Sequence, residues 1–154
     1  MFKGTVVSIH IAPAAEAAMQ AVAEVRAVPG QGLEGDRYFN HGGTFSKPQP
    51  DRELTLIESE AIDAFRREFG VEVNQGFSRR NIVTRAVPLN HLVDREFLIG
   101  EVRLRGLRLC EPCSHLAKLN PGSDVLRGLV HRGGLRAQIL TEGIISAGAE
   151  VIEA

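Results

Sequence analysis

The sequence predicts a mostly β fold, a distorted barrel-like sheet with a few short α-helices, in one domain spanning residues 1–154. Three observations indicate this fold class: short segments alternate apolar and polar residues, 16 glycines punctuate the chain, and helical periodicity is rare. The length of 154 residues is a common size for one domain, and no repeat or linker divides the chain.

Alternating apolar and polar residues predict half-buried strands along the whole chain. They cover residues 7–11, 23–27, 53–56 and 135–139, with shorter candidates at 81–84, 96–99 and 143–151. The alanine-rich segment 12–18 contains Pro13 and has no polar face, so we expect a surface loop or a single helical turn there.

Helical periodicity is clear in one segment. A helix is predicted to begin with Ser59 as its N-cap and to end at Gly70, because an apolar stripe runs between them, made of Ala61, Ile62, Phe65 and Phe69. A weaker helix is expected over about residues 123–130, and a short one is expected to begin near Cys113.

The segment before the two cysteines changes its alternation at Gly106. Val102 and Leu104 hold even positions, whereas the next apolar residues hold odd ones. A strand cannot change faces, so one extra residue must be absorbed, and a β-bulge at Gly106 would absorb it. The bulge predicts that Leu107 and Leu109 stay in the core, while one polar face carries Arg103, Arg105, Arg108 and Cys110.

The composition argues against binding to nucleic acid or to a membrane. The net charge is −1, and no apolar run reaches the roughly 18 residues of a spanning helix. The first residues alternate like a strand and lack the layout of a signal peptide, so we expect a cytoplasmic protein. Among the 18 basic residues only Lys3, Lys47 and Lys118 are lysines, and arginine is the cation that binds carboxylate or phosphate bidentately.

The two cysteines belong to a Cys-Glu-Pro-Cys turn at residues 110–113, and several interpretations of it stay open. A zinc site would need His115 and His131 or a partner subunit, because no second Cys-x-x-Cys is present. A thioredoxin-like redox pair would need a parallel βαβ unit, and we expect none in this chain. One of the cysteines, rather than both, could be a small buried hydrophobe. Cys113, at the start of a helix and near arginines, is favoured over Cys110 as a thiolate nucleophile or soft-metal ligand.

Three segments rich in glycine and arginine are candidates for the surroundings of this turn. The first spans residues 30–43, and the others begin strands near residues 79 and 131. Each segment alone is weak evidence for a binding site, but together the three predict a pocket for a small anionic ligand beside the cysteines. The predicted binding residues are Arg37, Arg79, Arg80, Asn81, His131, Arg132 and Gly133.

Six motifs in a fixed order give the chain a family resemblance. They are Gly-Leu-Glu-Gly-Asp-Arg at 32–37 with His-Gly-Gly at 41–43, Glu-Leu-Thr-Leu-Ile at 53–57, Arg-Arg-Asn-Ile-Val-Thr at 79–84, Leu-Cys-Glu-Pro-Cys at 109–113, His-Arg-Gly-Gly-Leu-Arg-Ala at 131–137 and Gly-Ile-Ile-x-x-Gly at 143–148. From about Gly4 to Val151 the chain resembles the MOSC domain, which occurs at the C-terminus of molybdenum cofactor sulfurases and in small stand-alone bacterial proteins. Two positions depart from the family pattern: Tyr38 stands where histidine is frequent, and Ala149 replaces the closing aspartate.

The resemblance implies a distorted β-barrel and a cysteine, Cys113, that handles sulfur or molybdenum. One hypothesis is a sulfur carrier, similar to a sulfurtransferase, that holds a persulfide on Cys113 and works with a cysteine desulfurase or a molybdenum enzyme. The alternative is a reductase of N-hydroxylated compounds that binds the molybdenum cofactor, with Cys113 as metal ligand and the arginines on the cofactor phosphate. A third is a non-catalytic binding module. No pyridoxal phosphate site is expected, because the chain lacks the desulfurase domain.

Overall fold

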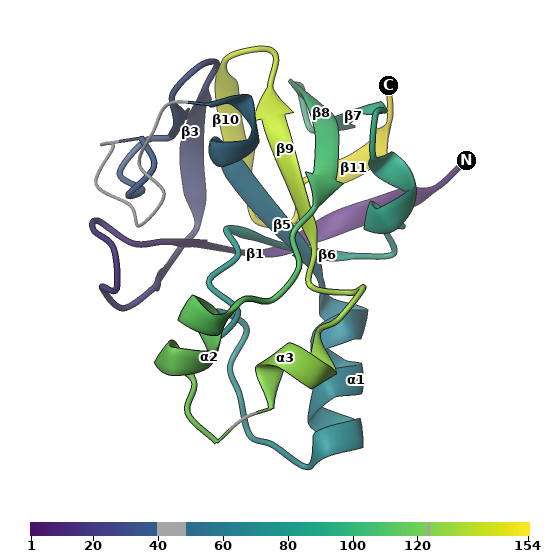
Figure 1. The fold of residues 1–154 in the computed structure, drawn as a ribbon. Helices are drawn as coiled ribbons and strands as arrows, with labels where there is room; N and C mark the ends of the chain where they lie inside the picture. Colours follow the sequence, from purple (N-terminus) through teal and green to yellow (C-terminus); the bar gives the residue numbers. More distant parts are fainter. Residues whose placement is uncertain (40–48, 123) are drawn as a thin grey trace.

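The structure, a computed structural model, describes residues 1–39, 49–122 and 124–154. Its main feature is a closed barrel of mixed strands (Figure 1). In order around the barrel these strands are β11 (Glu150–Glu153), β7 (Glu96–Ile99), β8 (Val102–Leu109), β9 (Leu135–Ile139), β5 (Leu54–Glu58), β6 (Ile82–Arg85) and β1 (Lys3–Ile11), and β1 pairs back with β11. The predicted mostly β, barrel-like fold is confirmed.

Four shorter strands attach to this barrel or lie beside it. β2 (Gln20–Val22) pairs with the end of β1. A separate sheet has the order β10 (Gly143–Ser146), β3 (Glu24–Val28) and β4 (Gly32–Leu33). The segment predicted as one strand at 143–151 is therefore two strands, which diverge at a turn where Gly148 has a φ of 86°.

One expectation about connectivity is wrong. The strands β5 and β6 pair in parallel, and the helix α1 (Ser59–Phe69) connects them, so the chain does contain a parallel βαβ unit. The cysteine turn lies outside this unit, after β8. The helix itself is close to the prediction: Gly70 ends it in the left-handed conformation, but Glu58 rather than Ser59 is its N-cap.

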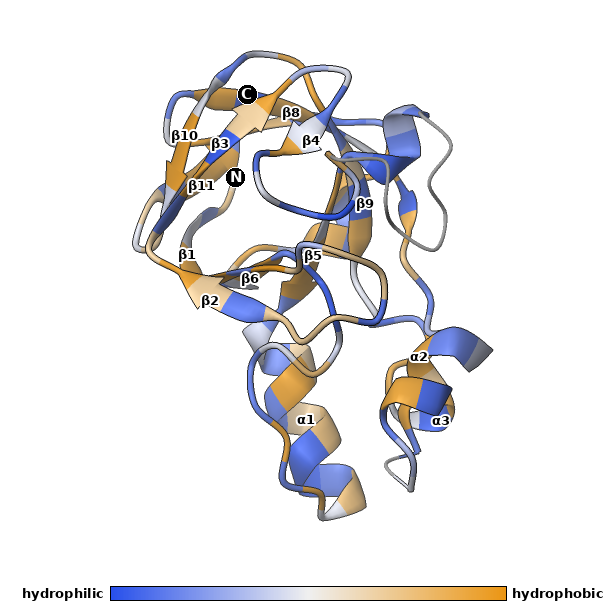
Figure 2. Cartoon of the chain, turned by 90° about the vertical axis from the view of Figure 1, so that its left-hand side faces the viewer, coloured by the Kyte–Doolittle hydropathy of each residue, from blue (hydrophilic) through white to orange (hydrophobic). Residues whose placement is uncertain are grey.

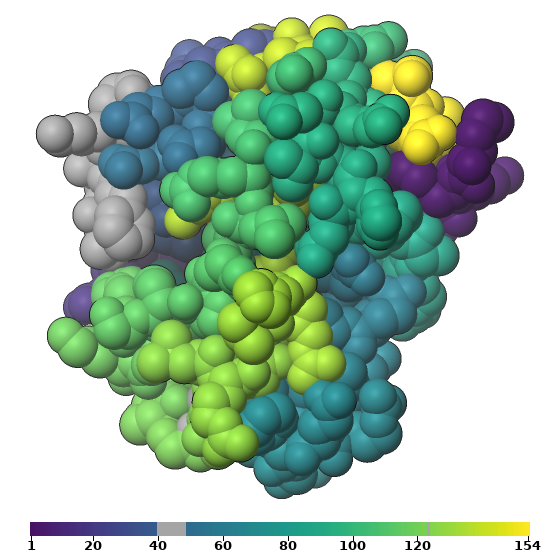
Figure 3. Space-filling view, turned by 45° about the vertical axis from the view of Figure 1, so that its right-hand side comes forward, coloured from purple at the N-terminus to yellow at the C-terminus, as the bar shows by residue number. Residues whose placement is uncertain are grey.

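The apolar residues form two cores. The first fills the barrel with side chains such as Ile9, Leu56 and Leu104, all completely buried. The second lies below the barrel, where α3 (Val125–Gly128) packs against both α1 and α2 (Ser114–Leu119), and Phe65 belongs to this core. Figure 2 shows this arrangement, with apolar strands above and the amphipathic α1 below. In Figure 3 the three helices form one continuous lobe under the barrel.

The two weaker helices follow their predictions in position but not in length. The helix α2 begins directly after Cys113, as expected. The helix α3 covers only residues 125–128 of the predicted 123–130, and Ser123 lies outside the described residues. Single 3-10 turns occur at Pro50–Arg52 and Leu89–Leu92.

The β-bulge in β8 occurs where the change of alternation predicts it. The pairing of β8 with β9 shifts register between Gly106 and Arg108. A Cβ atom on Gly106 would lie 2.1 Å from the Leu92 carbonyl oxygen, so only glycine fits there. The prediction that Leu107 and Leu109 stay in the core is wrong, because both are only half-buried. The bulge lets Leu107 leave the inner face, whereas Leu109 faces a cavity near the cysteines.

No helix in the described parts of the chain is long and apolar enough to cross a membrane.

Candidate functional site

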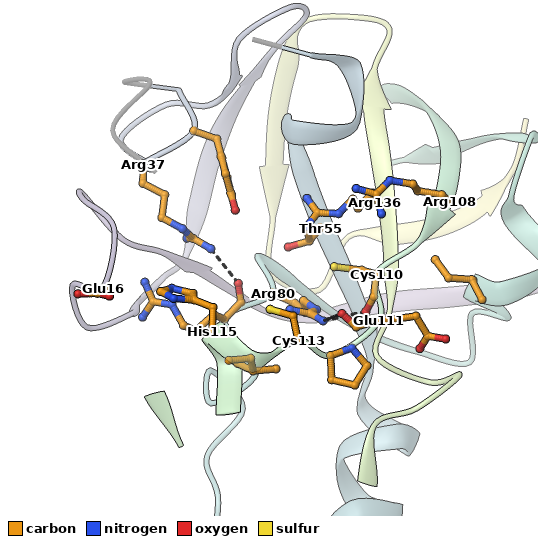
Figure 4. Close-up of a pocket in the computed structure, with 15 residues that line it drawn as sticks. Glu16, Arg37, Thr55, Arg80, Arg108, Cys110, Glu111, Cys113, His115 and Arg136 are labelled. Atoms are coloured by element: carbon orange, nitrogen blue, oxygen red, sulfur yellow. Dashed lines mark hydrogen bonds between the residues drawn. The ribbon is translucent and has the colours of Figure 1, made fainter. Parts of the chain in front are cut away.

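A cavity of about 290 Å³ lies where β8 ends, and both cysteines form part of its wall (Figure 4). Segments far apart in the sequence build it: the cysteine turn, the first half of β9, the loop before β6, and loops near residues 16 and 37. Its charged lining residues are five arginines and two glutamates, namely Arg37, Arg79, Arg80, Arg108, Arg136, Glu16 and Glu111. The predicted convergence of arginines on the cysteines is therefore present for Arg37, Arg79 and Arg80.

The two cysteines differ in accessibility. Cys110 follows the last residue of β8 and is 2% exposed, and its N–H donates to the Gly134 carbonyl at 2.7 Å. Cys113 is exposed and precedes the first residue of α2. Neither thiol is in a disulfide. A reagent in solvent therefore meets Cys113 first, while Cys110 faces the cavity from the barrel side.

Arg80 anchors the cysteine turn through backbone carbonyls. Its Nε donates to the Gly133 oxygen at 2.8 Å and its Nη1 to the Ser78 oxygen at 3.1 Å. Its Nη2 donates to the Cys110 oxygen at 2.8 Å and, more weakly, to the Glu111 oxygen at 3.4 Å (Figure 4). The buried guanidinium group of Arg80 thus connects three segments that meet at the cysteines.

Two other contacts fix the same turn. The carboxylate of Glu111 accepts the His131 backbone N–H at 2.7 Å and lies 3.0 Å from its Nδ1. A Cβ atom on Gly133 would lie 2.5 Å from the Cys110 carbonyl oxygen, so the segment after α3 can approach the turn only without a side chain at this position. Both predicted residues, His131 and Gly133, therefore contact the turn, while the His131 side chain points to solvent.

Arg37 and Arg79 enter the cavity together from the opposite side. Arg37 forms a buried ion pair with Asp36 at 3.1 Å and donates to the Arg79 carbonyl at 3.2 Å. Arg79 has a φ of 61° and donates through Nη1 to the Ala17 oxygen at 2.7 Å. Burial, and then the charge of Arg37, lower the pKa of Arg79. Its buried Nη2 has no hydrogen-bond partner among the described residues.

Arg108 and Arg136 form the upper wall. Arg108 makes an ion pair with Asp51 at 2.9 Å, and Arg136 Nη1 donates to the Asp51 backbone oxygen at 3.2 Å. The Nε of Arg136 is buried and makes no hydrogen bond within the described part of the chain. Arg136 has no ion pair within the described ranges either, and the same holds for Arg79 and Arg80. The cavity therefore presents more guanidinium groups than carboxylates, a composition suited to an anion.

The remaining predicted residues lie elsewhere. Asn81 is buried and accepts from Thr55 N–H through Oδ1 while its Nδ2 donates to the His10 carbonyl, so it joins strands rather than lining the cavity. The Arg132 guanidinium contacts the Gly128 carbonyl and Glu68 on α1. Arg103 pairs with Glu96, and of the three arginines expected on one face with Cys110 only Arg108 lines the cavity. The motif at 41–43 lies outside the described residues.

Sequence reasoning did not assign Glu16, Thr55, Tyr38 or Arg136 to this cavity. Arg136 could have been found, because it alternates with Leu135 and Ala137 and so lies on the outward face of its strand, as Arg108 does on the neighbouring strand. Among the described residues, no three His, Cys, Asp or Glu side chains are grouped as a metal site.

The family model of the MOSC domain matches residues 37–152, which is about three-quarters of the chain. The chain belongs to the MOSC domain family. This family is associated with molybdenum cofactor sulfurases and with proteins that bind the molybdenum cofactor. The residues of the cavity fall almost entirely within the MOSC match, apart from Glu16.

Solved structures with the same fold include small stand-alone MOSC proteins. The YUAD protein from Bacillus subtilis has a TM-score of 0.81 and 13% identity over 98% of this chain and 97% of that chain. YiiM from Geobacillus stearothermophilus has a TM-score of 0.77 and 16% identity over 98% and 75%, and YiiM from Escherichia coli has 0.71 and 21% over 97% and 69%. A comparison with curated proteins gave no match. These TM-scores support the MOSC fold, and the identities are too low to indicate the activity, which is argued from the cavity.

Proposed function

We propose that this MOSC protein binds the molybdenum cofactor, with the Cys113 thiolate as a metal ligand and the cavity arginines on the anionic part of the cofactor. The observation that carries the proposal is the excess of arginine around an exposed thiol: five arginines and two glutamates line the cavity of Cys113, and both Arg79 and Arg136 have a buried nitrogen without a partner among the described residues. A bound anion would balance this positive charge.

The residues present fit such a group in two respects. A thiolate is a soft ligand of the kind that molybdenum accepts, and Cys113 is the exposed thiol of the cavity. A buried arginine donor without a partner costs free energy in the absence of a ligand, about 1–3 kcal/mol for each donor. The volume of about 290 Å³ is near the lower end of small-molecule sites, so part of a larger cofactor would extend toward solvent.

The chain's own residues have distinct roles in this proposal. Cys113 would hold the metal, and Arg79 and Arg136 would donate to phosphate oxygens. Arg80 holds the cysteine turn through the Cys110 and Gly133 carbonyls and so acts as a positioning residue. When bound, the cofactor supplies two-electron redox chemistry at molybdenum. The activity that we propose is the reduction of an N-hydroxylated compound to the amine and water, with the two electrons supplied by an external reductant.

A second candidate is a sulfur carrier, favoured by the exposure of Cys113 beside a second, buried thiol. The Cys113 thiolate would attack the terminal sulfur of a donor persulfide, for example that of a cysteine desulfurase. The donor sulfur–sulfur bond breaks, the donor leaves as a thiolate, and Cys113 carries the persulfide. Neighbouring guanidinium groups would stabilise the negative charge of the Cys113 persulfide.

Native mass spectrometry of protein purified anaerobically from cells that make the molybdenum cofactor separates these proposals. We expect the mass of the cofactor on the wild type and on Cys110→Ala, and its loss from Cys113→Ala. A single added sulfur on Cys113, without metal, would support the carrier instead. Wild type without either adduct would contradict both and leave a non-catalytic binding module.

A further inference from the structure

Arg108 and Arg136 place two like charges opposite each other at the upper wall of the cysteine cavity. They are direct partners in the antiparallel pairing of β8 with β9, just after the bulge at Gly106. Figure 4 shows both side chains above Cys110. Like charges at directly opposed positions destabilise a sheet, so this pair of arginines needs a counter-charge.

Asp51 supplies that counter-charge. It lies in the 3-10 turn Pro50–Arg52, shortly before β5. Its Oδ2 accepts from Arg108 Nε at 2.9 Å, and its backbone oxygen accepts from Arg136 Nη1 at 3.2 Å. No other carboxylate of the described residues forms an ion pair with either arginine. One negative charge is thus shared by two guanidinium groups.

The Asp51 carboxylate depends on Arg108 in turn. Within the described residues, Arg108 is its only hydrogen-bond donor, and the other carboxylate oxygen, Oδ1, is buried without a donor. The Asp51 side chain is 23% exposed and does not line the cavity, whereas Arg108 does. Asp51 therefore holds Arg108 from outside the cavity, and an anion inside the cavity meets a guanidinium group whose charge is already balanced.

One guanidinium charge cannot be neutralised fully by two anions at once. A ligand anion that binds Arg108 weakens the ion pair between Arg108 and Asp51, and the partly buried carboxylate then loses its donor. The ion pair thus stabilises the free cavity more than the occupied one. By thermodynamic linkage, the same ion pair must weaken the binding of the anion.

We propose that Asp51 sets the anion affinity of the cysteine cavity, because its carboxylate competes with the anionic ligand for Arg108. This role rests on the proposed function, since that function places an anion in the cavity. The consequence is that the cavity binds its anion reversibly, although five arginines line it.

Asp51→Asn removes the charge with little change of shape. The asparagine Oδ1 can still accept from Arg108, and the backbone oxygen that binds Arg136 is unchanged. The matched control is Glu16→Gln, which removes a carboxylate that lines the same cavity and forms no ion pair with Arg108 in the described part of the chain. Arg108→Gln removes the guanidinium group for which the two anions compete.

The test is a nuclear magnetic resonance titration of the isotope-labelled protein with inorganic phosphate, followed through the Arg108 Nε–H signal and the Cys110 amide signal. Asp51→Asn should bind phosphate at least about threefold more tightly than the wild type. In the Arg108→Gln background, Asp51→Asn should not improve phosphate binding. Glu16→Gln should change the Kd by the same factor with and without Arg108, because the two residues share no contact.

The proposal is overturned if Asp51→Asn binds phosphate as the wild type does or more weakly. It is also overturned if the gain is equal with and without Arg108, since that gain would be a long-range effect of charge. Should Asp51→Asn fail to give a dispersed spectrum, Asp51→Ser replaces it as the charge-free variant.

The titration also separates this proposal from the proposed function. Phosphate that binds the wild type, with no gain in Asp51→Asn, overturns only the role of Asp51. Phosphate that shifts no cavity signal in the wild type or in Asp51→Asn overturns both the role of Asp51 and the anion site of the proposed function.

Discussion

Replacing Arg80 tests whether this arginine holds the cysteine turn rather than a ligand. Its guanidinium donates to three backbone carbonyls at 2.8, 3.1 and 2.8 Å and more weakly to a fourth at 3.4 Å, and the residue is only 8% exposed. Hydrogen bonds to charged groups contribute about 1.5–3 kcal/mol each. Lysine in Arg80→Lys keeps the charge, but its donors sit on one nitrogen, whereas the Arg80 bonds come from three nitrogens, so we expect about two of the carbonyls to lose their donor.

The loss of two such bonds lowers the free energy of unfolding by about 3–6 kcal/mol. For a chain of this size, that corresponds to a decrease in Tm of roughly 6–24 °C. The matched control is Arg136→Lys in the same cavity, because Arg136 makes one bond to a carbonyl at 3.2 Å and its Nε has no partner among the described residues. We expect Arg136→Lys to lower the free energy of unfolding by less than about 1 kcal/mol.

Urea unfolding followed by circular dichroism measures both variants. The prediction requires Arg80→Lys to be the less stable by at least about 2 kcal/mol and Arg136→Lys to be the one that loses phosphate binding. Equal losses of stability, or a loss of phosphate binding confined to Arg80→Lys in a fully stable protein, would refute the assignment of Arg80 as the anchor of the turn.

Three further predictions follow from burial and packing. Cys110→Ser should react with iodoacetamide at the wild-type rate and Cys113→Ser at least about tenfold more slowly, because the remaining thiol is 2% exposed. Gly128→Ala should lower the free energy of unfolding in urea by about 1–3 kcal/mol, since its Cβ would lie 2.0 Å from Phe65 Cδ1. His10→Gln should reduce the loss of stability between about pH 7.5 and pH 5.5.

The direction of the pH effect of His10→Gln follows from the pKa of His10 in the folded protein. Burial lowers the pKa of His10 below 6.5, so the unfolded chain takes up the proton first as the pH falls. The wild type therefore loses stability below that pH, and the glutamine variant lacks this contribution. Identical pH profiles would contradict the assignment. Fast labelling of Cys113→Ser would contradict the difference between the thiols, and an unchanged urea midpoint for Gly128→Ala would contradict the packing of α3 on Phe65.

The sequence predicts some of the features that depend on strand geometry, although the burial of Leu107 and Leu109 was predicted wrongly. The change of alternation at Gly106 required a bulge, and β8 contains one. The end of β8 then determines where Cys110 lies, and residues next to strand starts, such as Arg79 and Arg80, converge on it. These predictions succeed because the period of a strand is two residues and few arrangements satisfy it.

Other features depend on contacts that the pattern of residue types does not encode. Arg80 binds carbonyl oxygens, and every residue carries one, so its partners could not be inferred from side-chain chemistry. Arg132 is adjacent to Gly133 in sequence but contacts Glu68 on α1, a carboxylate 64 positions away. The strand β6 was predicted, but its parallel pairing with β5 was missed, because a loop separates α1 from β6 and the amphipathic helix alone does not reveal with which strand, or in which direction, the next strand pairs.

The measurement that tests the central claim most directly is X-ray absorption at the molybdenum edge. Protein from cells that make the cofactor would be compared with Cys113→Ser and Cys110→Ser, the latter as the matched control. We predict molybdenum in the wild type and in Cys110→Ser with the same sulfur coordination, and one sulfur ligand fewer, or loss of the metal, in Cys113→Ser. Wild-type protein without molybdenum, or a spectrum that Cys113→Ser leaves unchanged, would contradict the assignment of Cys113 as the ligand.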